Sequence, residues 1–179
     1  MFARRDGVTL LLLSFNVLCG AGEDQFTPLL ASALNGNTQV FPGTDGRQHV
    51  VYELVMINAN ATPATLQKVE VAPAAYSTRL IATYQGSELL AHLRSTANTA
   101  VANPEIELNG VRVFLIHLAR PAGPPVPERL IHRLTLLGGA TPSPKPQTPV
   151  ALEYLVAPLT LSANVPTIGP PLKLSLIHI

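Results

Sequence analysis

The sequence has no tryptophan and a single cysteine, Cys19, so neither an internal disulfide framework nor a zinc site made of cysteines can form. Charged residues make up only 13% of the 179 residues, and the formal net charge is +1. Because Lys and Arg are scattered singly beyond Arg4 and Arg5, this charge gives little basis for a nucleic-acid groove. Hydrophobic residues reach 47%, which is enough for one ordinary domain with a core.

The amino terminus has the pattern of a secretory signal peptide. Arg4 and Arg5 precede an apolar run, VTLLLLSFNVLC, that is too short to span a bilayer comfortably. Cys19 and Ala21 then fill the small-residue positions of a cleavage site. We therefore expect residues 1–21 to be a signal peptide, the protein to be secreted or periplasmic, and the mature chain to have no stable membrane span.

Two other interpretations of this leader stay open. The apolar run could be a buried first strand or helix, which the basic pair before it and the polar GEDQ after it argue against. Alternatively, Cys19 could be lipidated, although Leu18 stands where such sites usually have a small residue.

Beyond the leader, apolar and polar residues alternate in short runs that end at Gly, Pro, Asn and Asp, which is typical of half-buried antiparallel strands. The first clear run, QHVVYELVMIN, has apolar residues at both its even-numbered and its odd-numbered positions. We therefore expect this strand to be buried on both faces. In TLQKVEV, we expect Thr65, Gln67, Val69 and Val71 to share one face. The expected strands are 48–58, 65–71, 79–84, 111–118, 128–137 and 150–161.

The period changes once, in SELLAHL, where Ser87 is expected to cap one or two helical turns. Asn109 and Gly110 lie between two apolar runs, and this dipeptide favours the positive φ angles of a tight hairpin turn. A longer loop, with only residues 111–118 in the sheet, is the alternative. The Pro-rich stretch 141–149 is expected to be a surface loop or a linker.

Short strands at intervals of about ten residues predict an all-β fold, an antiparallel immunoglobulin-like β-sandwich with one short helix. A closed barrel is the structural alternative. We expect residues 22–40 to be a flexible segment and residues 41–173 to form the sandwich domain.

Residues suited to catalysis or metal binding are sparse. The five histidines show none of the HxH, HxxxH or HExxH spacings of zinc enzymes, and there is no GxSxG elbow or glycine-rich phosphate loop. His117 and His132 lie on strands expected to be neighbours, so they form either a metal pair or one surface and one packed histidine. We expect no catalytic, cofactor-binding or metal-binding residue, and no enzyme activity, in this chain.

Two surface features bear on partners. Asn60 begins an Asn-Ala-Thr triplet that matches an N-glycosylation acceptor. Partner contacts are expected at the polar loop 44–47 and at the Pro-rich loops, because loops carried on a rigid sandwich do much of the recognition in such folds.

The stretches GTDGRQHVVYELVMIN, LQKVEV, YQGSELLAHL, VRVFLIHL, VPERLIHRLTL and IGPPL resemble the N-terminal β-sandwich region of secreted bacterial proteins whose C-terminal half is a lysostaphin-type zinc metallopeptidase domain. The resemblance covers residues 41–173. In such proteins the GPPL passage runs into the catalytic domain, whose zinc is held by a His and an Asp four apart and by the second His of an HxH. This sequence has no counterparts of those residues, so the resemblance implies no zinc ligand here.

The last residues, LSLIHI at 174–179, are what CTG TCT CTT ATA CAC ATC encodes, and that string matches the end of a transposase-based sequencing adapter. We expect this tail to be adapter read-through and not native protein. A genuine apolar C-terminal strand is the alternative.

The resemblance and the leader together imply a non-catalytic extracytoplasmic domain, the N-terminal part of a cell-wall zinc metallopeptidase. It would position or shield a C-terminal peptidase domain in the same chain, or contact cell-wall material or proteins. A free-standing secreted adhesion or binding module is the alternative, since the fold alone does not fix a function. An independent hydrolase is a third hypothesis.

Overall fold

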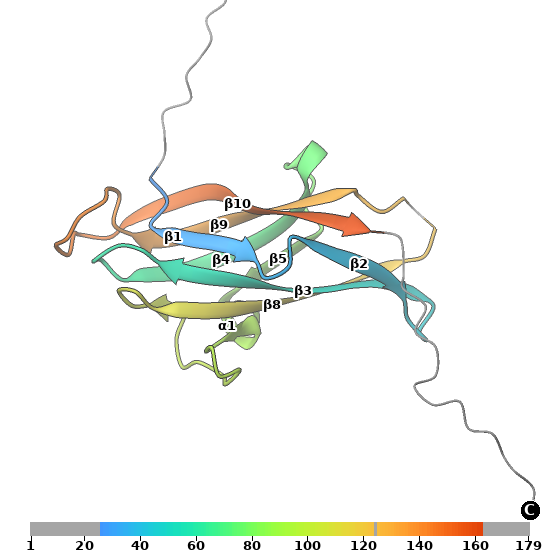
Figure 1. Cartoon of the computed structure of the whole chain (residues 1–179), viewed down its shortest axis with the longest axis horizontal. Helices are drawn as coiled ribbons and strands as arrows, with labels where there is room; N and C mark the ends of the chain where they lie inside the picture. The colour runs from blue at the N-terminus through green and yellow to red at the C-terminus, as the bar shows by residue number, and fades with distance from the viewer. Residues whose placement is uncertain (1–25, 124, 163–179) are drawn as a thin grey trace, which may run out of the picture.

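The computed structural model describes residues 26–123 and 125–162 of the chain. The expected leader at 1–21 and the expected tail at 174–179 lie outside the described residues. One curled β-sheet with a short helix makes up the described part (Figure 1). Its elements are β1 (Leu29–Ala33), β2 (Asn37–Pro42), β3 (Arg47–Asn58), β4 (Ala64–Pro73), the 3-10 helix η1 (Ala74–Tyr76), β5 (Ala82–Gln85), α1 (Gly86–His92), β6 (Leu93–Arg94), β7 (Glu105–Ile106), β8 (Val111–Pro121), β9 (Arg129–Gly138) and β10 (Val150–Ser162).

The strand order is β5-β4-β9-β10-β2-β3-β8-β6, with β1 added to β3 and β7 added to β4. The sheet curls so that β9 and β10 lie over β3 and β8, with the core between them (Figure 1). The prediction of an all-β fold with one short helix is confirmed. The prediction of a purely antiparallel sheet is wrong in one place, because Thr160–Ser162 of β10 pairs in parallel with Asn37–Gln39 of β2. Within the described residues, no helix has the length and apolarity needed to span a membrane.

Strand β3 shows how alternation positions the core. Val50, Leu54 and Met56 are buried and share one face of the strand. The expectation that both faces are buried is wrong, because Val51 is 50% exposed and Ile57 is 41% exposed. Their side of the sheet points away from β9 and β10, so it lies outside the core between the two layers (Figure 1).

Strand β4 departs from simple alternation at a β-bulge. The register with β9 shifts between Leu66 and Lys68, so Gln67 is the extra residue and is exposed. Leu66 and Val69 are therefore both buried, although their spacing is odd. The expectation that Gln67 shares a face with Val69 is wrong for this reason.

The strand expected at 79–84 begins only at Ala82, because Arg79 belongs to a turn in which its N–H bonds the Tyr76 carbonyl at 2.9 Å. The helix then starts at Gly86, directly after Gln85 completes the pairing of β5 with Lys68 of β4. Gln85 is the N-cap residue, so the expected cap at Ser87 is wrong. The strand pairing carries the chain to Gln85, which fixes where the helix can begin.

The predicted hairpin around Asn109 does not form. Glu105–Ile106 pairs with Ala64 and Thr65 of β4, not with β8. Asn109 does take the expected positive φ of 56°, in a turn closed by the Gly110 N–H on the Glu107 carbonyl at 2.8 Å. The alternative of a longer loop before Val111 is therefore correct.

The segment 22–40 was expected to be flexible, and for Leu29–Ala33 and Asn37–Val40 this is wrong. Strand β1 pairs with the end of β3, from Leu29 opposite Asn58 to Ala33 opposite Leu54. The Tyr154 hydroxyl of β10 donates to the Leu29 carbonyl at 2.9 Å and accepts the Leu29 N–H at 3.2 Å. Leu29 is fully buried, so the sheet begins before residue 41.

Candidate functional site

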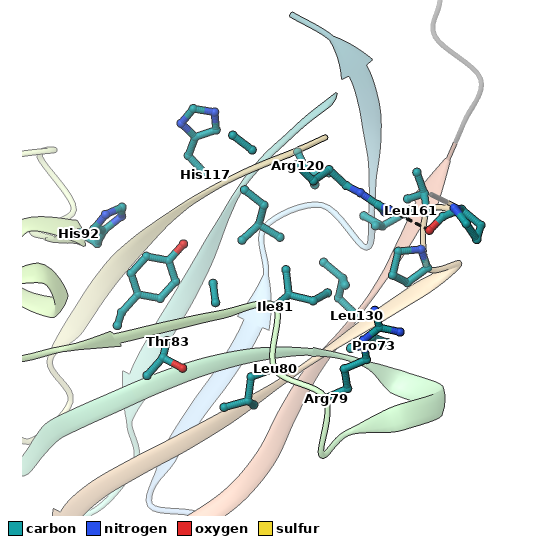
Figure 2. A pocket seen from close by; sticks show the side chains of 18 of the residues that line it. Pro73, Arg79, Leu80, Ile81, Thr83, His92, His117, Arg120, Leu130 and Leu161 are labelled. Carbon is teal, nitrogen blue, oxygen red and sulfur yellow. Dashed lines mark hydrogen bonds between the residues drawn. The ribbon is translucent and has the colours of Figure 1, made fainter. Parts of the chain in front are cut away.

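A groove of about 750 Å³ lies between the two edges of the curled sheet. One wall is β5 with the turn before it, and the other is the C-terminal half of β8. Figure 2 shows His92 and His117 toward one end of the groove, and Pro73, Arg79 and Leu161 toward the other. The lining is Val50, Pro73, Arg79, Leu80, Ile81, Ala82, Thr83, Tyr84, Glu88, His92, His117, Leu118, Ala119, Arg120, Pro125, Val126, Pro127, Leu130 and Leu161.

The groove exists because β5, at one end of the strand order, pairs with neither β8 nor β6 at the other end. Strand β6 continues the sheet beyond β8 over only two residue pairs, which leaves the rest of that edge without a strand partner among the described residues. The helix α1 joins β5 to β6 and closes one end of the gap. Two sheet edges therefore face each other across an apolar floor that includes Leu118 and Leu130.

Side chains from α1 and β5 form hydrogen bonds with backbone groups along the edge of β8. His92 donates from Nδ1 to the Leu115 carbonyl at 2.6 Å. The backbone N–H of His117 faces the Tyr84 phenol. Satisfied edge groups resist the addition of another strand, so this groove is suited to contacts through side chains.

Tyr84 is the aromatic anchor of the wall. Its ring lies 4.7 Å from the His92 ring and 5.3 Å from the Phe114 ring, measured between centroids. Burial raises the pKa of the Tyr84 phenol, and the Glu88 charge acts in the same direction, against the backbone N–H of His117, which lowers it. The phenol therefore stays protonated at neutral pH.

The charge in the groove is mixed but favours an anion at one end. Arg79 is exposed, and Arg120 is held with its Nη2 3.0 Å from the Pro125 carbonyl. Glu88 is the carboxylate in the lining, on α1. Between the charges, Leu80 and Ile81 are more than 40% exposed, so the wall offers two adjacent apolar side chains for contact.

The structure separates the two histidines considered as a metal pair. His117 is exposed on β8, and His132 is fully buried on β9, which pairs with β4 and β10 and not with β8. The Tyr52 hydroxyl bonds His132 Nε2 at 2.8 Å, and His132 Nδ1 bonds the Ala157 carbonyl at 2.7 Å. The interpretation as one surface and one packed histidine is confirmed.

The other sequence candidates have mixed outcomes. Asn60 is 2% exposed and donates from Nδ2 to the Thr141 carbonyl at 3.2 Å, so the folded chain does not present it to a glycosylating enzyme. The loop 44–47 lies beside β8 but outside the groove, whereas the Pro-rich loop after β8 contributes Pro125 and Pro127. Nothing in the sequence indicated that residues 79–83 line a groove, because their pattern is that of an ordinary strand.

No protein-family model matches this chain, and no curated protein matches it either.

Proposed function

We propose that this chain is a non-catalytic, immunoglobulin-like β-domain of an exported protein of the lysostaphin-type zinc peptidase kind, acting in the periplasm or outside the cell. In this proposal, the groove between β5 and β8 holds a cell-wall peptide and so positions it for a peptidase domain in the same protein. The groove is the observation that carries the proposal; the likeness of residues 41–173 to such proteins supports it.

The lining of the groove favours a short apolar peptide that carries a carboxylate. Leu80, Ile81 and Val126 offer apolar contact, and Arg79 and Arg120 offer charge at the end away from the histidines. Cell-wall stem peptides combine small apolar residues with free carboxylates. Arginine is well suited to such carboxylates because its guanidinium group binds them in a two-pronged geometry.

Binding to purified, insoluble peptidoglycan in a sedimentation assay tests the proposal. Ile81→Glu places a carboxylate in the groove wall and is expected to abolish cosedimentation. Leu155→Glu is the matched control, since Leu155 is 49% exposed and Ile81 is 42% exposed, but Leu155 lies on β10 outside the groove. Failure of the wild-type chain to sediment, or equal loss in both variants, would count against the groove as the binding site.

Reading the native gene beyond the codon for Lys173 tests the other half. A downstream domain with HxxxD and HxH motifs supports a peptidase in the same chain. A stop codon within a few residues would refute that part and leave a free-standing binding module, which uses the same groove.

A further inference from the structure

A chain of three polar side chains lies on the outer face of the sheet, where the turn between β2 and β3 meets β8. His49 Nδ1 is 2.8 Å from His117 Nε2, and His49 Nε2 is 2.9 Å from Asp45 Oδ1. The two imidazole planes are 24° apart, with their centroids 5.1 Å from each other. His49 is therefore held between a carboxylate on one side and a second imidazole on the other.

The local sequence builds a seat for the His49 ring. In the turn GTDG, the Gly46 N–H bonds the Gly43 carbonyl at 3.2 Å, and Asp45 Oδ1 also accepts the Arg47 N–H at 3.0 Å, which fixes the carboxylate. A Cβ at Gly43 would collide with the His49 ring and the Asp45 carboxylate, so only glycine leaves room for this arrangement. Phe41 stacks on the other side, with its ring centroid 5.8 Å from that of His49.

The hydrogen bonds determine which nitrogens carry lone pairs. An ionised carboxylate only accepts, so Asp45 fixes the proton of neutral His49 on Nε2 and leaves a lone pair on Nδ1. In the hydrogen-bonded pair, His117 then donates from Nε2. If neutral His117 carries its proton on Nδ1 instead, both facing nitrogens present lone pairs. A cation that lies beside the line between the two nitrogens can then bind both, once the rings turn so that their lone pairs converge on it.

We propose that His49 Nδ1 and His117 Nε2 bind a divalent transition-metal ion, preferentially Cu²⁺, with Asp45 as the outer partner that orients His49. A carboxylate behind a ligating imidazole is the usual support of a histidine–metal bond. Among residues 26–123 and 125–162, no group of three His, Cys, Asp or Glu side chains converges on one point. The site therefore has two protein ligands, and water or a bound ligand fills the other positions.

The spacing of the two nitrogens indicates which metals fit. With metal–nitrogen bonds of about 2.0–2.1 Å, cis positions of a square-planar or octahedral ion are about 2.8–3.0 Å apart, and tetrahedral positions are about 3.3–3.4 Å apart. The observed 2.8 Å matches the cis spacing. Tetragonal nitrogen and oxygen coordination is typical of Cu²⁺ and Ni²⁺, and Cu²⁺ binds such ligands most tightly of the divalent ions in its row.

This site does not depend on the proposed role of the groove, although His117 lines its rim. Titration of the full chain in a Cys19→Ser background, which removes its one thiol, tests it with CuSO₄, NiSO₄ and ZnSO₄ by calorimetry. We expect micromolar binding of one Cu²⁺, weaker Ni²⁺ and weakest Zn²⁺. Electron paramagnetic resonance of the copper complex should show two imidazole nitrogens.

Variants separate the pair from other histidines. His117→Ala is at an exposed position and should fold normally while losing the site, and Asp45→Asn should weaken copper binding by about 10- to 100-fold. His92→Ala is the control, since His92 bonds the Leu115 carbonyl and lies outside the pair. Equal copper affinity in His117→Ala and wild type, tighter binding of Zn²⁺ than of Cu²⁺, or a signal from one imidazole alone would overturn the proposal.

Discussion

The buried His132 should make the stability of this domain fall as the pH drops from 7 to 5. Its ring is fully buried, with Nδ1 donating to the Ala157 carbonyl and Nε2 accepting from the Tyr52 hydroxyl. Burial raises the pKa of Tyr52, so that hydroxyl keeps its proton and remains a donor. Neutral His132 therefore satisfies both neighbours, and a second ring proton would put a charge into the core.

Burial lowers the pKa of His132 from 6.5 to about 4, against the opposing effect of its hydrogen bonds to the backbone of Ala157 and Val156, which raise it. Between these values the unfolded chain binds a proton that the folded chain does not, so stability is lost as the pH falls through this window. Above pH 6.5 the contribution is complete. At about 1.4 kcal/mol per pH unit, the loss is about 2 kcal/mol at pH 5 and about 3 kcal/mol once both states are protonated.

Urea unfolding at pH 7 and pH 5 measures this loss. With a typical urea dependence of about 1–3 kcal/mol per M, a loss of about 2 kcal/mol lowers the midpoint by about 1 M. His132→Gln removes the titrating group, so the difference between wild type and variant isolates His132 from the surface histidines. If the variant loses as much stability as wild type between the two pH values, the reasoning is wrong.

Two further predictions concern polar groups that hold the fold together. Tyr154→Phe removes the hydroxyl that bonds both backbone groups of Leu29, and should speed amide hydrogen exchange in β1 while costing about 1–3 kcal/mol of stability. Unchanged exchange at Leu29 would show that β1 is held by its pairing with β3 alone. Asn58→Ala deprives the buried Thr62 and Ile106 carbonyls of their donor. It should lower the free energy of unfolding, measured in urea, by about 1–3 kcal/mol. A loss below about 0.5 kcal/mol would contradict the assigned bonds.

The strands that could be predicted from the sequence are those with long, regular alternation. Strands β3, β8, β9 and β10 fall close to their expected ranges because each buries one face against the core. Strands β1 and β2 were missed because LLASA and NTQVFP carry little alternation of their own. They become strands through partners distant in the chain, as when Thr160–Ser162 pairs with Asn37–Gln39.

The turn at Asn109 and Gly110 was predicted correctly, but the two strands expected to pair across it do not. Asn109 has the positive φ that the Asn-Gly dipeptide favours, yet its turn joins β7 to β8 without pairing them. The Asn109 N–H instead bonds the Asn58 carbonyl at 3.1 Å, so the turn closes the end of β3. A dipeptide specifies its own dihedral angles, but competition among strands decides which segments pair.

The histidine pair shows why a site of this kind is not visible in a sequence without strand register. His49 and His117 are 68 positions apart, and only the pairing of Val51 with His117 and of His49 with Ala119 places them diagonally on one face. A slip of one residue between β3 and β8 would turn the His117 side chain into the core and separate it from His49. Spacing rules such as HxH find ligands on one element; here two elements supply one ligand each. The register of β3 against β8 therefore decides whether His49 and His117 can share a metal ion, and copper binding by the pair would be a direct test of that register in solution.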